Sequence, residues 1–205
     1  MDRQYRELPI RELGPDAGFR RPQQPLPARV TLESSALEVM TDLSRVSPAT
    51  IRPQAPLEGA NQFMISRGVR LLLVIDVRDT VLGVLTATDV LGEKAMRVSV
   101  ERGAKRSELT VADLMTPAER VEVIALEDLQ GARVGHLLET LRRSGRQHAL
   151  VVDHDGAAPA APPVRRAMVR GIVSLSQLAR QLGLLLPQAG EVARTFAEIE
   201  AALGR

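Results

Sequence analysis

The chain has 205 residues and a mass of 22.3 kDa, enough for one sizeable core or two small ones. Hydrophobic residues make up 44% and charged residues 25%, a composition typical of a folded globular protein and not of a disordered one. The longest apolar run, at residues 71–75, is far shorter than the roughly 20 residues of a membrane span. The N-terminus lacks the apolar segment of a secretory signal. We therefore expect a cytoplasmic protein without membrane association.

Several kinds of chemistry are disfavoured by the residues that the chain lacks. Cysteine is absent, which excludes disulfides, thiol nucleophiles and cysteine-ligated zinc. The histidines His136, His148 and His154 do not form an HExxH pair, and no glycine-rich loop of the Walker type occurs. The sequence also offers no plausible Ser-His-Asp spacing. We expect no enzyme, no catalytic residue and no metal site.

The charge pattern gives little support to nucleic-acid binding. The net charge is only +2, and the pI of about 9.6 is high because few groups titrate between neutrality and that pH. The four aromatic residues are scattered along the chain, whereas base stacking needs them clustered. Arg165, Arg166 and Arg170 form one local basic patch, which we interpret as a solvated loop.

Both ends of the chain differ in character from its middle. Residues 1–28 contain five prolines and no apolar periodicity, which predicts a flexible arm, although a strap across the folded body is the alternative. Residues 188–205 place apolar side chains at helical spacing and predict an amphipathic helix that packs on the body of its own chain. Those side chains are Val192, Phe196, Ile199 and Leu203.

The middle of the chain is an internal repeat. The segment GVRLLLVID ends at Asp76, and GRQHALVVD ends at Asp153, an offset of 77 residues. GVLTATD begins at Gly83 and GIVSLSQ at Gly171, an offset of 88, so the second copy carries an insertion between its two strands. Upstream, VMT at 39–41 corresponds to LMT at 114–116. The composition GAAPAAPPVRR predicts that the insertion is a longer hairpin loop.

Each copy predicts the element order β-α-β-β-α. The expected strands are 50–52, 71–75 and 81–85 in the first copy, and 121–124, 149–152 and 169–173 in the second. Helices are expected to end at Gly68 and Gly145 and to begin again at Ala87 and Leu175. The predicted fold class is α+β, with two such units packed sheet to sheet about a pseudo-twofold axis. The units span 29–108, with a linker helix from about residue 90, and 109–187, with the hairpin insertion.

This duplicated pattern resembles the CBS domain, and two copies in tandem resemble the CBS pair, or Bateman module. The resemblance covers roughly residues 36–183 and rests on the xMT, GVRLLLVID and GVLTATD segments. It implies clefts between the copies that bind adenosine-containing ligands, and a molecule that forms dimers and regulates a partner. In the family, the closing motif of Gly, two residues, Ser or Thr, two residues and Asp marks the ribose site.

Residues 83–89 fit that motif at every position, which makes Thr86 and Asp89 the leading candidates for ligand binding. An ionised carboxylate accepts hydrogen bonds from both ribose hydroxyls, and the helix N-terminus behind Thr86 favours an anion. The same spacing is typical of a capping box, in which both side chains only satisfy backbone N–H groups. In the second copy Ser174 and Gln177 also fit a capping box. Gln177 is neutral with one acceptor oxygen, so we expect the Asp89 cleft to bind better.

The resemblance also implies contacts from the other strands. Arg70 precedes the middle strand and is expected to contact phosphate, with His148 near the corresponding place in the second copy. The adenine pocket is expected to be lined by apolar and backbone groups of the opening strands. The full set of expected ligand-binding residues is Thr50, Ile51, Arg52, Arg70, Thr86, Asp89, Val121, Val123, His148, Ser174 and Gln177.

Together these features predict a stand-alone CBS-pair regulatory module. It is expected to bind AMP, ADP, ATP or a related adenosyl compound, to form a homodimer, and to signal to an unidentified protein partner. No cofactor is required, and Mg²⁺ is expected only if ATP is the ligand. The alternative is a nucleotide-independent dimeric scaffold with vestigial clefts, which Gln177 and the leucines Leu73 and Leu150 favour because the family often has proline in the middle strand.

Overall fold

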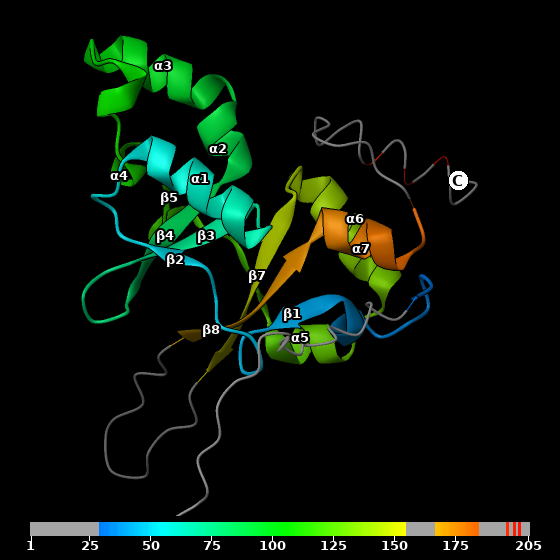
Figure 1. The fold of residues 1–205 in the computed structure, drawn as a ribbon. Coiled ribbons are helices and arrows are strands. Elements are labelled where there is room, and N and C mark those ends of the chain that lie inside the picture. The colour runs from blue at the N-terminus through cyan, green and yellow to red at the C-terminus, as the bar shows by residue number, and fades with distance from the viewer. Residues whose placement is uncertain (1–28, 155–166, 185–195, 197–198, 200, 202–205) are drawn as a thin grey trace, which may run out of the picture.

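A computed structural model describes residues 29–153 and 167–184 in full, the backbone of residue 154, and residues 196, 199 and 201 (Figure 1). The predictions made for the arm at 1–28 and for the hairpin insertion with Arg165 and Arg166 lie outside the described residues. Most of the expected C-terminal helix does so as well.

The first sheet contains four strands in the order β2-β3-β4-β5. These strands are β2 (Thr50–Ile51), β3 (Leu71–Ile75), β4 (Val81–Thr86) and β5 (Thr116–Pro117). β2 runs parallel to β3 because the helix α1 (Leu57–Arg67) connects them, whereas β3, β4 and β5 are antiparallel neighbours. The predicted strand, helix, strand, strand order of the first copy is therefore confirmed.

The second sheet repeats this arrangement in the order β1-β8-β7-β6. Its strands are β6 (Val123–Ala125), β7 (His148–His154), β8 (Ala167–Ser174) and β1 (Met40–Asp42), and α6 (Val134–Ser144) connects the parallel strands β6 and β7. The fold is the predicted α+β architecture of two four-stranded sheets.

The two sheets exchange one short strand. β1 lies early in the chain but pairs with β8 of the second copy, with Met40 opposite Val173. β5 follows the first copy and pairs with β4, with Thr116 opposite Val84. The two xMT segments therefore occupy equivalent edge positions, one in each sheet. Because of this exchange, each sheet contains one strand from the other side of the expected boundary between residues 108 and 109. The boundary itself stays a prediction.

The sheets pack face to face through alternate residues of their strands. Leu71, Leu73 and Ile75 form an apolar cluster together with Leu150 of the second sheet. Leu72 and Val74 point the other way and join the core beneath α1. A strand that is buried on both faces shows continuous hydrophobicity, which is why β3 is apolar at every position.

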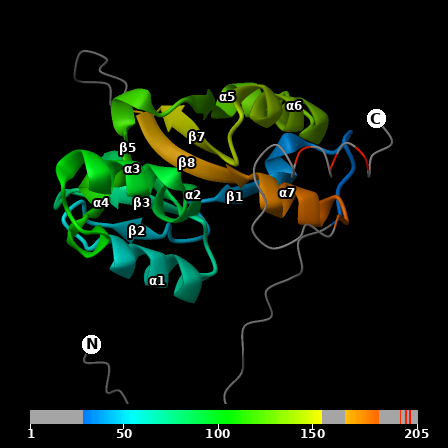
Figure 2. The ribbon, with the colours of Figure 1, turned by 90° about the horizontal axis from the view of Figure 1, so that it is seen from above.

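Helices cover the outer face of each sheet. Figure 2 shows α1 on one outer side and α5 (Leu126–Gln130) with α6 on the other, with the sheets between them. α7 (Leu175–Gln181) and the 3-10 turn at Ala36–Val39 complete the second core. Gly68 and Gly145 end α1 and α6 with positive φ values of 63°, so both predicted helix stops are confirmed.

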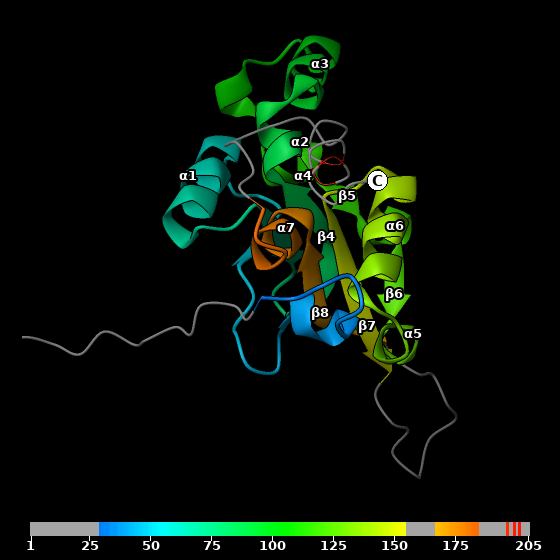
Figure 3. The same cartoon turned by 90° about the vertical axis from the view of Figure 1, so that its right-hand side faces the viewer.

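The linker between the copies is helical but broken. α2 (Ala87–Leu91) ends at Gly92, where α3 (Glu93–Arg102) begins, and a 3-10 turn at Arg106–Glu108 follows. The short helix α4 (Val111–Leu114) and α5 carry too few turns to show a periodic pattern in the sequence. Figure 3 shows α3 at the end of the molecule opposite α5.

Two described residues of the C-terminal segment belong to the second core. Phe196 and Ile199 are 6% and 0% exposed and pack in the apolar cluster that includes Val30 and Leu178. This contact agrees with the expectation that the C-terminal segment packs on its own chain. No helix in the described part of the chain is long and apolar enough to cross a membrane.

Candidate functional site

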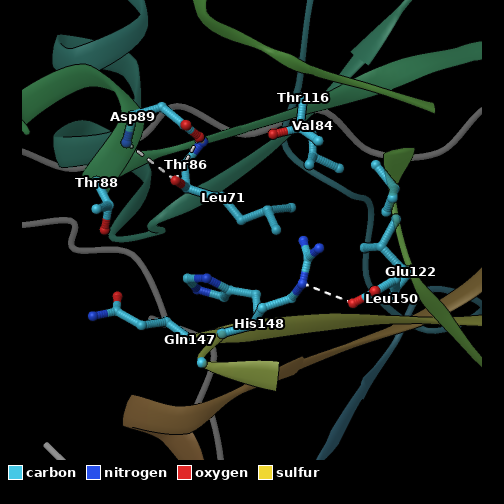
Figure 4. Close-up of a pocket in the computed structure, with 13 residues that line it drawn as sticks. Leu71, Val84, Thr86, Thr88, Asp89, Thr116, Glu122, Gln147, His148 and Leu150 are labelled. Atoms are coloured by element: carbon cyan, nitrogen blue, oxygen red, sulfur yellow. Dashed lines mark hydrogen bonds and ion pairs between the residues drawn. The ribbon is translucent and has the colours of Figure 1, made fainter. Parts of the chain in front are cut away.

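A pocket of about 200 Å³ lies between the two copies (Figure 4). One wall belongs to the first sheet and the helix after it, and consists of Leu71, Val84, Thr86, Thr88, Asp89 and Thr116. The other wall is formed by residues just before or within the strands β6 and β7 of the second sheet. They are Val121, Glu122, Gly145, Arg146, Gln147, His148 and Leu150. Leu71, Val84 and Leu150 also belong to the apolar cluster between the sheets, so the polar groups converge on an apolar base.

Asp89 is held on the first wall by a reciprocal capping box at the start of α2. Its Oδ2 accepts hydrogen bonds from the backbone N–H of Thr86 at 2.9 Å and from Thr86 Oγ1 at 2.7 Å. The backbone N–H of Asp89 donates in return to Thr86 Oγ1 at 3.2 Å. Asp89 Oδ1 lies 2.7 Å from Nζ of Lys94, at the start of α3. The capping interpretation is confirmed, and the box also positions the carboxylate at the pocket wall.

His148 lies on the wall that faces Asp89 and Thr86 (Figure 4). Burial and, to a smaller extent, the nearby positive charge of Arg70 lower the pKa of His148 from 6.5 to about 4. The imidazole is therefore neutral near pH 7 and presents one donor nitrogen, one acceptor nitrogen and a flat ring to the pocket. A neutral aromatic ring of this kind is suited to contact with a purine base.

Sequence reasoning missed the ion pair on the second wall. Nε of Arg146 lies 3.0 Å from Oε2 of Glu122, and both residues line the pocket. The sequence did contain a signal for Arg146. It directly follows Gly145, which ends a helix, and so it corresponds to Val69 in the first copy, one position before Arg70. Arg146 is the cationic side chain among the pocket residues.

Four of the expected ligand-binding residues meet at this pocket: Thr86, Asp89, Val121 and His148. The others are not among its lining residues: Thr50, Ile51, Arg52, Arg70, Val123, Ser174 and Gln177. Arg52 is directed elsewhere, because its guanidinium donates to the carbonyl oxygens of Ile75 and Asp76 at the β3–β4 hairpin. The positive charge of Arg70 lies close enough to His148 to contribute to the lowering of its pKa.

The corresponding motif in the second copy has a different local structure. Ser174 precedes α7 but makes no side-chain cap, so the capping box expected at Ser174 and Gln177 is wrong. Oγ of Ser174 lies 2.9 Å from Oγ of Ser176, and Oε1 of Gln177 accepts a hydrogen bond from Thr41 Oγ1 at 3.1 Å. The pairing of β1 with β8 brings Thr41 within reach and diverts the Gln177 side chain from the helix end.

No group of three or more histidine, aspartate or glutamate side chains that could hold a metal ion occurs among the described residues. A fixed carboxylate, a neutral imidazole, an ion pair and an apolar base are groups that bind a polar organic ligand. The arrangement defines a two-copy α+β protein with a pocket between its copies.

Comparisons with known proteins show which proteins this chain resembles. Residues 36–95 match the CBS domain family. The structure resembles an uncharacterised conserved protein from Pyrococcus horikoshii, with a TM-score of 0.52, 18% identity and coverage of 78% of this chain and 100% of the other. It also resembles a CBS-domain-containing protein from Agrobacterium tumefaciens, with a TM-score of 0.50, 17% identity and coverage of 73% and 94%.

A further similar structure is the CBS-pair protein CBSX2 of Arabidopsis thaliana in complex with AMP. Its TM-score is 0.49, with 21% identity and coverage of 72% of this chain and 94% of the other. A comparison with curated protein sequences finds no match. Residues 36–95 match a CBS domain, and the chain as a whole shares the fold of a CBS-domain-containing protein.

Proposed function

We propose that this protein is a regulatory module that binds an adenosine-containing nucleotide in the pocket at Asp89 and signals to a protein partner. The observation that carries the proposal is the position of Asp89 at the wall between the two copies. Its side chain is 14% exposed and faces a neutral His148 across the pocket. The carboxylate suits a sugar diol and the imidazole suits a base. CBS-pair proteins are generally regulatory rather than catalytic.

Isothermal titration calorimetry with AMP, ATP, adenosine and S-adenosylmethionine tests this proposal. We expect at least one of them to bind, and Asp89→Asn to weaken that binding by about tenfold or more, because a charge-assisted acceptor is lost. Asp79→Asn is the matched control, because Asp79 is 80% exposed at the β3–β4 hairpin. Absence of binding heat with all four ligands would refute the proposal.

One observation favours the alternative of a nucleotide-independent dimeric scaffold. Met96 and Val100, four residues apart on α3, are 72% and 76% exposed. In this alternative a second copy of the chain covers that helix face. Sedimentation equilibrium and thermal denaturation distinguish the two functions. A dimer whose mass and melting temperature do not change when nucleotides are added, and which dissociates in the Met96→Glu variant, supports the scaffold.

A further inference from the structure

The hydrogen-bonding capacity of Asp89 is nearly used up within the protein. An ionised carboxylate has about four acceptor positions. The backbone and side chain of Thr86 occupy two of them at Oδ2, and the ammonium of Lys94 occupies a third at Oδ1. A ribose offers two hydroxyl donors, so a diol can bind Asp89 fully only if one of these internal partners leaves.

Lys94 is the partner that can leave. The hydrogen bonds from Thr86 belong to the capping box, in which Thr86 Oγ1 also accepts from the N–H of Asp89. Breaking them would remove the N-terminal cap of α2. Lys94 lies at the start of α3, beyond the break at Gly92, and its side chain is 31% exposed. Its four-carbon stem allows the ammonium to move while the helix stays in place.

We propose that Lys94 competes with the ligand for Asp89 and thereby selects ligands that carry an anion close to their diol. This inference rests on the proposed function. A neutral nucleoside takes Oδ1 from Lys94 and gives the partly buried ammonium no new partner, which weakens its binding. A nucleoside phosphate supplies an anion beside the same sugar, and the displaced ammonium pairs with it. Lys94 is thus a specificity-determining residue outside the pocket lining.

The test compares AMP with adenosine by calorimetry on the whole chain. In the wild type we expect AMP to bind about tenfold or more tightly than adenosine, the range of one charge-assisted hydrogen bond. In Lys94→Met the ratio is expected to fall to within about threefold, with adenosine binding more tightly than it does to the wild type. Lys94→Arg keeps the charge and is expected to keep the preference for AMP.

Lys105→Met is the matched control, because Lys105 is the other lysine of the chain and is exposed. It is expected to leave the ratio unchanged. An unchanged ratio in Lys94→Met, or equal weakening of both ligands, would overturn the inference, because Lys94 would then only hold Asp89 in place. Failure of AMP and adenosine to bind the wild type overturns the inference as well. If Asp89→Asn weakens the binding of both ligands while Lys94→Met leaves their affinity ratio unchanged, the inference fails and the proposed function stands.

Discussion

The two copies contain a pair of glycines that should respond differently to the same substitution. Gly83 in β4 and Gly171 in β8 open the equivalent motifs GVLTATD and GIVSLSQ. A Cβ atom at Gly83 would fall inside the van der Waals distance of the Thr116 carbonyl oxygen and 3.1 Å from the Pro117 Cα, both backbone atoms of β5. At Gly171 the three atoms nearest to the added Cβ would all belong to the flexible side chain of Met40.

The expected costs follow from what has to move. In Gly83→Ala the strand β5 must shift, which disturbs its pairing with β4 and costs about 1–3 kcal/mol of the free energy of unfolding. In Gly171→Ala the Met40 side chain can adopt another rotamer, at a cost below about 1 kcal/mol. The change in backbone entropy from glycine to alanine affects both variants equally and cancels in the comparison.

Urea denaturation followed by circular dichroism measures both variants against the wild type. A loss of about 2 kcal/mol in Gly83→Ala corresponds to a fall in melting temperature of about 4–8 °C for a chain of this size. Because Thr116 also lines the pocket, Gly83→Ala should weaken ligand binding, whereas Gly171→Ala should not. Equal destabilisation of the two variants would refute the reasoning that the close backbone contact with β5 makes a side chain at residue 83 more costly than one at residue 171.

Two further predictions concern stability. The folded-state pKa of His148 lies below its unfolded value of 6.5, so the unfolded chain takes up the proton first and stability falls as the pH drops from about 6.5 to 4. We expect a loss of about 1 kcal/mol per pH unit, which His148→Gln should remove in pH-dependent denaturation; an identical slope in both proteins would contradict this. Leu85 is 0% exposed, so Leu85→Ala should cost about 2–5 kcal/mol in the same assay. Ile65, which is 65% exposed, serves as its control, and equal losses from the two alanine substitutions would show the burial argument to be wrong.

Local patterns were enough to predict the repeated elements. The apolar run at 71–75, the glycines that end α1 and α6, and the Thr86–Asp89 spacing each depend on residues close together in the sequence. Side-chain alternation, helix capping and left-handed helix ends are properties of short segments, so the sequence carries them without reference to the rest of the chain. The pairing of two repeats also follows from sequence, because one unit alone is too small for a core.

The sequence by itself determined the repeated strands and helices and the candidate carboxylate, and the tertiary structure decided which groups share the pocket. Nothing local indicates that Thr41 reaches Gln177, that Glu122 is the partner of Arg146, or that Arg52 donates to the β3–β4 hairpin. Thr41 reaches Gln177 because β1 pairs with β8, and the partners in all three contacts lie far apart in the chain. Their geometry depends on how whole faces pack, a property that no single segment contains.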